Sequence, residues 1–265
     1  MMFWFKKKKI VFDCFTHDRA AHDVYPIRKA MPYYPDTIKQ MPPTVQVTDP
    51  NTNIDVPAST LKMCSGINGL YKQGAIIPFW TDYICQPHKA IVERNSRLGV
   101  ADGYHQDRIH EHPRIQFNGM FDNYVNVKFN GVWQIKEKSG IKVLIIPATY
   151  NLNNFNYNFI IPPSLSYYDL QTQTNLQMFV RADCPDFTIL AGTPIMHLIP
   201  ITENEVEWRT HLISLEDWCK IEGDIPMSFP ELGTGSRNNR YKKLMKEKEE
   251  MDKMEKSKCP FGFGK

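Results

Sequence analysis

Residues 124–129 are YVNVKF, 142–147 are KVLIIP, 177–180 are QMFV and 193–201 are TPIMHLIPI. These four runs lie between Phe117 and Ile201, are rich in apolar, β-branched and aromatic residues, and are bounded by turn residues. Runs of this length and composition are typical of strands in a compact sheet. The segment therefore predicts a mainly β protein, and no catalytic motif of high specificity lies on it.

Two dipeptides in this segment predict where the chain reverses. Asn130-Gly131 is the strongest short-range signal for a hairpin, so we expect Tyr124–Phe129 to pair with Trp133–Ile135. Ser139-Gly140 predicts a second reversal before the strand at 140–147. At the end of the segment, residues 187–190 and 193–201 predict two strands joined by a turn at Ala191-Gly192.

The composition is that of an ordinary globular protein, with 42% hydrophobic and 23% charged residues in 265. The six cysteines include no Cys-x-x-Cys pair, so a zinc knuckle is not expected, and a chain of this length does not need a disulfide framework. We expect reduced thiols in a cytoplasmic compartment. The first five residues, MMFWF, precede Lys6–Lys9 and are too short for a secretory signal, and no apolar run is long enough to span a membrane.

The net charge is +3, and the surplus of Lys and Arg is concentrated in residues 236–258. The body of the protein is therefore not a basic platform for nucleic acid, and we do not expect a nucleic-acid partner. Nucleic-acid binding through Lys6–Lys9 with the preceding aromatics, or through the basic tail, stays open as an alternative.

The N-terminal part predicts a strand followed by an arm. Residues 10–16 alternate loosely and predict a first strand. Residues 17–60 hold seven prolines, which exclude a long helix but leave room for a short one at Asp36–Gln40. We expect residues 1–58 to form a proline-rich arm over a core domain at 59–225, in which Ser59–Gly74 predicts a short helix and Ala75–Trp80 a buried strand.

The C-terminal part predicts helices and a terminal peptide. Ser214 is a candidate N-cap for a helix at 214–221. Residues 226–265 then hold a breaker-rich linker, a charged helix at Asn238–Lys256 and the peptide CPFGFGK. This helix is either solvated or docks on a partner subunit, which would make a homo-oligomer. The aromatic residues near the two termini, Trp4, Phe5, Phe261 and Phe263, are candidates for binding a partner protein.

One constellation suggests a metal site. His105 and Asp107, together with the distant His197, match the two-histidine, one-carboxylate set that holds Fe²⁺ in cupin-like oxygenases. Arg209 follows at a spacing at which such enzymes keep an arginine for the co-substrate. The alternative is that His105 and Asp107 belong to a solvated loop and that His197 is a strand histidine bonded to the backbone.

Three pieces of the chain resemble a known family when taken together: TLKMCSGINGLYKQGAIIPFWTDY at 60–83, HPRIQF with VNVKFNGVWQIKEKSGIKVLIIP at 112–147, and FTILAGTPIMHLIPI at 187–201. In this order they resemble an uncharacterised family of marine tailed-phage proteins, cyanophages especially, with distant bacterial relatives. The resemblance implies a phage origin and assigns no activity, so no functional residue is carried over from it.

Together these observations predict a single β-sandwich or jelly-roll-like barrel with a few short helices and a charged C-terminal helix. We expect a phage-encoded, non-enzymatic protein that acts through protein–protein binding, in the virion or in the cytoplasm of the infected host. A cupin-like iron enzyme that uses His105, Asp107 and His197 is one alternative, and a nucleic-acid-binding protein is another.

Overall fold

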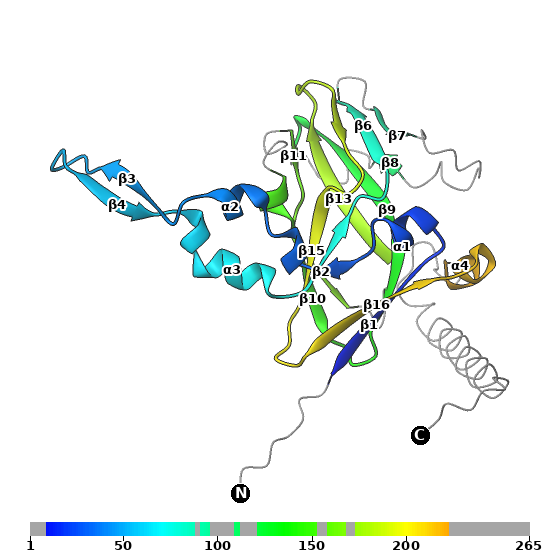
Figure 1. The fold of residues 1–265 in the computed structure, drawn as a ribbon. Helices are drawn as coiled ribbons and strands as arrows, with labels where there is room; N and C mark the ends of the chain where they lie inside the picture. The colour runs from blue at the N-terminus through cyan, green and yellow to red at the C-terminus, as the bar shows by residue number, and fades with distance from the viewer. Residues whose placement is uncertain are drawn as a thin grey trace, which may run out of the picture. The chain divides into compact units, whose positions relative to one another are not determined.

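The computed structural model describes residues 9–87, 91–95, 109–111, 121–152, 158–167 and 173–222. The chain divides into two compact units, Met1–Leu212 and Ile213–Lys265, and each is described by itself. The first unit is mainly β, as the sequence predicts, and its strands form two large sheets that enclose a common core (Figure 1).

The first sheet runs in the order β11, β13, β9, β1, β16, with β8 beside β9. Its strands are β11 (Phe159–Ile160), β13 (Gln173–Arg181), β9 (Tyr124–Lys136), β1 (Ile10–Thr16), β16 (Val206–Leu212) and β8 (Ile109–Glu111). The second sheet runs in the order β12, β10, β15, β5, β2. Its strands are β12 (Ser164–Tyr167), β10 (Lys142–Pro147), β15 (Pro194–Pro200), β5 (Ala75–Pro78) and β2 (Arg28–Lys29).

Two smaller sheets complete the strand pairing. One consists of β14 (Phe187–Ile189), β6 (Asp82–Gln86) and β7 (Ile91–Asn95), in that order. The other is the hairpin of β3 (Thr44–Thr48) and β4 (Asp55–Ser59).

The core explains why these segments are strands. Phe12 and Trp133 from the first sheet and Val143, Ile77 and Leu198 from the second belong to one buried apolar cluster. Alternation along a strand places every second side chain in this cluster. The arrangement confirms a β-sandwich-like body with few short helices.

Strand β1 lies inside the first sheet, although it comes from the segment expected to form an arm. It pairs in parallel with β16, from Ile10 opposite Val206 to Thr16 opposite Leu212, and antiparallel with β9 on its other side. All but one of its seven side chains are buried, as expected for an interior strand covered on both faces. Residues 10–16 therefore belong to the β body, and the arm expected for residues 1–58 does not begin with them.

The hairpin predicted at Asn130-Gly131 is wrong. Strand β9 continues through both residues, and its partner along most of its length is β13, with a shift of register between Gln173 and Asn175. A Cβ at position 131 would lie 1.9 Å from the carbonyl oxygen of Thr174 on β13. Gly131 is thus required because the two strands approach each other closely at this position. The chain reverses instead after the end of β9, where Gly140 has a φ of +70°.

The segment 30–74 is an insertion between two paired strands. Lys29 of β2 lies opposite Ala75 of β5, so the 45 residues between them leave the second sheet and return to it. We call residues 30–74 the arm. It holds the 3-10 helices η1 (Met31–Tyr33) and η2 (Leu61–Met63), the helices α2 (Asp36–Gln40) and α3 (Ser65–Tyr71), and the hairpin of β3 and β4.

The base of the arm packs on the β body, whereas its hairpin does not. Ile38 of α2 and Ile67 and Tyr71 of α3 form a small buried cluster with Ile76 of β5. The short helices expected at Asp36–Gln40 and within Ser59–Gly74 are both present. Figure 1 shows the hairpin extending from this base, away from the two large sheets.

The remaining helices are short. Helix α1 (Arg19–Asp23) is capped by Asp18, and the 3-10 helix η6 (Thr149–Asn151) follows β10. In the second unit, Ser214 accepts a hydrogen bond from the backbone N–H of Asp217 at the start of α4 (Leu215–Glu222), as the sequence predicts. In the part of the chain that the structure describes, none of the helices has the length and apolar character needed to cross a membrane. The expected helix at Asn238–Lys256 lies outside that part.

Candidate functional site

The hairpin of the arm has one apolar and one polar face. We call residues Thr44–Ser59 the ribbon. Val47 lies opposite Val56 and Val45 opposite Ala58, and because alternate residues share a face, Ile54 joins them. The other face carries Gln46, Thr48, Asp55, Pro57 and the two end residues. Val45, Val47, Ile54 and Val56 are between 42% and 62% exposed, so the apolar face of the ribbon is open to solvent.

Polar contacts hold the turn of the ribbon. The Asp49 carboxylate accepts a hydrogen bond of 2.8 Å from the backbone N–H of Asn51, and this bond lowers the pKa of Asp49 below its usual value. Thr48 donates from its hydroxyl to the Asp55 carboxylate across the strands, at 2.6 Å. The ribbon has these two carboxylates and no Lys, Arg or His, so it is negatively charged at neutral pH.

The edges of the ribbon are less suited to pairing than its face. Pro57 removes a backbone donor from β4, and Pro42 and Pro43 directly precede β3. Proline on an edge strand limits the addition of a further strand. The apolar face of the ribbon is therefore better suited than its edges to contact another molecule.

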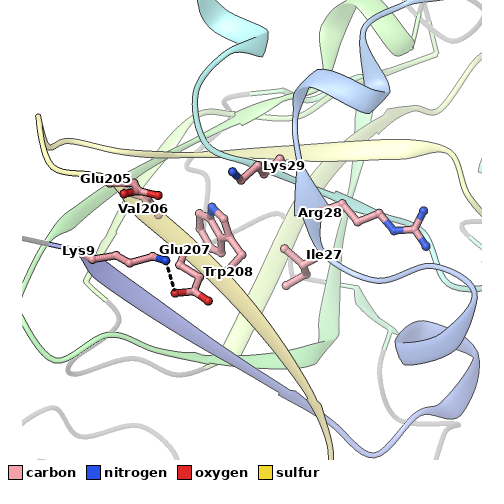
Figure 2. A pocket seen from close by; sticks show the side chains of 8 residues that line it. All are labelled: Lys9, Ile27, Arg28, Lys29, Glu205, Val206, Glu207 and Trp208. Carbon is pink, nitrogen blue, oxygen red and sulfur yellow. Dashed lines mark ion pairs between the residues drawn. The ribbon is translucent and has the colours of Figure 1, made fainter. Parts of the chain in front are cut away.

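A second candidate surface lies where the two large sheets end. A cavity of about 400 Å³ lies there. It is lined by residues of β2 and β16, by the residue that directly precedes each strand, and by Lys9. The full lining is Lys9, Ile27, Arg28, Lys29, Glu205, Val206, Glu207 and Trp208. We call this surface the groove (Figure 2). Ile27, Val206 and Trp208 form its apolar wall, and the Trp208 ring is stacked on Phe12 with centroids 4.4 Å apart. That stacking fixes the indole against the core.

The charges around the groove are unequal. Glu207 accepts from both Arg209 and Lys9, each at 3.0 Å, and these two bonds lower the pKa of Glu207 to about 2. Among the described residues, no carboxylate forms an ion pair with Arg28 or Lys29. Figure 2 shows their two side chains leaving β2 in opposite directions. Three cations, Lys9, Arg28 and Lys29, therefore line the groove, against the carboxylates of Glu205 and Glu207.

His197 lies in β15 and packs against the base of the arm. Its side chain is 1% exposed, its Nε2 is 2.8 Å from the carbonyl oxygen of Gln73, and its ring centroid is 5.8 Å from that of Tyr71. Burial lowers the pKa of His197, so its imidazole is neutral at pH 7 and Nε2 donates to the Gln73 carbonyl. These contacts fit the interpretation of His197 as a strand histidine bonded to the backbone.

The other predicted site residues lie outside the described residues. His105 and Asp107, the proposed partners of His197 at an Fe²⁺ site, are among them, as are Trp4, Phe5, Phe261 and Phe263. Within the described ranges, no three His, Cys, Asp or Glu side chains come together as a metal site. Arg209, the predicted co-substrate arginine, lies in the other large sheet from His197 and binds Glu207. The iron site remains a prediction.

Neither the ribbon nor the groove was predicted from the sequence. The ribbon has a signal that could have been found, because TVQVT at 44–48 alternates polar and apolar residues in the manner of a strand. The groove has no comparable signal in the sequence, since Lys29 and Trp208 are nearly 180 residues apart and are brought together only by the order of the strands.

Comparison with family models, curated proteins and solved structures finds no match to this chain.

Proposed function

We propose that this protein acts without catalysis, by binding another protein through the ribbon. The observation that carries the proposal is the exposed face of aliphatic side chains on a two-stranded hairpin that pairs with no other strand of the described chain. An isolated hairpin is marginally stable in water and needs a further layer to bury its apolar face. Burial contributes roughly 25 cal/mol for each Å² of apolar surface removed from water.

The charge of the ribbon limits the kind of partner. Asp49 and Asp55 are its only charged side chains, so phosphate groups of nucleic acid or of anionic lipid would be repelled. A protein surface with an apolar depression and a basic rim suits the ribbon better. The resemblance to phage proteins predicts that this partner belongs to the virion or to the infected host.

The proposal is tested by purifying partners on the full-length protein and on a Val47→Asp/Val56→Asp variant. An identified partner is then prepared pure, and its affinity for both proteins is measured. We expect the wild type to bind and the variant to bind at least tenfold more weakly, because two charges would have to be desolvated in the interface. Equal affinities for the two proteins would exclude the ribbon as the binding surface.

A Leu190→Asp variant is the matched control. Leu190 is 60% exposed in the turn after β14, outside the ribbon and the groove. This substitution places a similar charge on a similarly exposed aliphatic position. Its affinity for the partner should equal that of the wild type.

A further inference from the structure

The groove has the size and position of a small-molecule site. It lies between β2 and β16, the strands that end the two large sheets. Its volume of about 400 Å³ falls within the range of roughly 300–1,000 Å³ that is usual for ligand pockets. We propose that the groove binds a small organic carboxylate whose remaining body is flat and apolar. This site is independent of the ribbon and adds ligand binding to the proposed function.

The direction of Lys29 indicates the charge of the ligand. Residues that lie directly opposite each other in antiparallel strands point to the same face of the sheet. Lys29 lies opposite Ala75, a member of the core cluster that both large sheets enclose. Arg28 lies opposite Ile76, which packs instead with the base of the arm. Lys29 therefore points to the core side of β2, and Figure 2 shows it extending toward the side of Trp208, whereas Arg28 extends away.

The apolar wall of the groove lies on the same side as Lys29. Ile27 is two residues before Lys29 and belongs to the core cluster, so the two share a face. From the other sheet, Val206 and Trp208 pack against this cluster but remain partly exposed. Phe12 covers one face of the Trp208 ring, which leaves the rest of the indole to line the cavity. A flat apolar group can pack against this wall while its anionic end reaches Lys29.

Lys29 is the cation of the groove that is left for a ligand. Glu207 accepts from both Lys9 and Arg209, so Lys9 is already paired. No carboxylate of the described residues, that of Glu205 included, forms an ion pair with Lys29. An ammonium group beside an apolar wall favours an anion, because the wall excludes water and strengthens the attraction. The exposed Glu205 carboxylate opposes an anion in the same cavity, so its removal should increase the affinity.

The backbone on both sides of the groove is fixed in the absence of a ligand. The backbone N–H of Ile10 donates to the carbonyl of Glu205 at 2.8 Å, directly before β16. On the other side, the backbone N–H of Ala30 donates to the carbonyl of Gly74 at 3.2 Å, directly after β2. Most small-molecule sites are largely formed before their ligand binds, which reduces the cost of ordering. The groove meets this condition.

The experiment titrates the full-length protein with naphthylacetate by isothermal titration calorimetry. This probe carries a carboxylate on a flat, two-ring apolar body. We expect a dissociation constant below about 1 mM. Acetate has the charge without the body, and naphthylacetamide has the body without the charge, so each should bind at least about tenfold more weakly. Absence of naphthylacetate binding, or equal affinities for the acid and the amide, would overturn the proposal.

A pair of variants on β2 locates the bound carboxylate. Lys29→Met keeps much of the apolar stem of the side chain and removes its charge, so the affinity for naphthylacetate should fall about tenfold. Arg28→Met is the matched control, because it removes a cation from the adjacent position on the opposite face of the strand. Its affinity should remain within about twofold of the wild type. Equal losses in the two variants would show a general effect of charge and contradict a site at Lys29.

Glu205→Gln should have an effect of the opposite sign. It removes the like charge that faces the bound anion, so naphthylacetate should bind about two- to threefold more tightly. An unchanged or lower affinity would contradict the placement of the anion in the groove.

The ribbon variant Val47→Asp/Val56→Asp separates this site from the proposed function. Its groove is intact, so its affinity for naphthylacetate should equal that of the wild type. A loss of affinity in this variant would contradict a site confined to the groove.

Discussion

Gly74 joins α3 to β5 with a backbone φ of +68°. A Cβ at this position would lie 1.9 Å from the carbonyl oxygen of Leu198 in the neighbouring strand β15. The left-handed conformation and the close contact both require glycine. We predict that Gly74→Ala lowers the free energy of unfolding by about 2 kcal/mol or more, measured by chemical denaturation.

Gly69 offers a matched control for this substitution. It lies within α3, and a Cβ added there would meet no other atom within 4 Å. Because alanine favours a helix more than glycine does, Gly69→Ala should raise the free energy of unfolding by about 0.5–1 kcal/mol. Effects of the same sign at Gly69 and Gly74 would contradict this assignment of their roles.

His197 makes stability depend on pH. Burial lowers its pKa in the folded protein below the value near 6.5 that it has in the unfolded chain. As the pH falls through 6.5, the unfolded chain therefore takes up a proton that the folded protein does not, and stability decreases. We predict that His197→Gln, which keeps a donor for Gln73 but does not titrate, reduces the slope of unfolding free energy against pH between 7.5 and 5.5. An unchanged slope would show that His197 does not contribute.

Single residues were the least predictable level of this structure. The dipeptide Asn130-Gly131 has the composition of a hairpin turn, yet Gly131 is needed because β13 passes close to it. His197 has the residue type of a metal ligand, yet its Nε2 donates to a backbone carbonyl. In both cases the deciding partner is far away in the sequence, so local composition cannot identify it.

At the scale of elements, the ribbon is separable from the body. The backbone N–H of Thr60 donates to the carbonyl of Pro43 at 3.0 Å, so the two ends of the ribbon are adjacent. We predict that replacing Thr44–Ser59 with two glycines changes the melting temperature by less than about 2 °C, because the segment buries little apolar surface. Differential scanning calorimetry measures this. A much larger decrease would mean that the ribbon supports the fold.

Strands and short helices were predicted best where their own residues decide them. Asp36–Gln40 and the strands at 142–147 and 187–200 are in the places that the sequence indicates. The ribbon was missed because the seven prolines between 17 and 60 suggested an extended arm, although they exclude long helices and not a hairpin. An edge hairpin tolerates Pro57 because its outer side needs no backbone donor.

At the scale of the whole molecule, the core depends on β1. Phe12 is fully buried, in contact with Trp208, and lies on β1, an interior strand of the first sheet. We predict that Phe12→Ala lowers the free energy of unfolding by about 3–5 kcal/mol, as expected for a large aromatic removed from a core. Leu190→Ala, at an exposed site, should change it by less than about 0.5 kcal/mol. Urea denaturation distinguishes these outcomes.

The mainly β class was predictable because it follows from composition and alternation along the whole chain. The sheet order was not, because it depends on pairings such as β1 with β16, which join segments at opposite ends of the described chain. The groove exists only as a result of that order. Sequence alone could therefore indicate the mainly β class but not the groove beside Lys29 and Trp208.

The parallel pairing of Ile10–Thr16 with Val206–Leu212 has a consequence during synthesis. A ribosome adds roughly 5–20 residues per second, so about 10–40 seconds separate the appearance of the two strands. Throughout that interval, the nascent polypeptide presents the aromatic segment IVFDCFT with one side unprotected. Chaperones that recognise such segments would have their longest opportunity to bind at this end of the emerging chain.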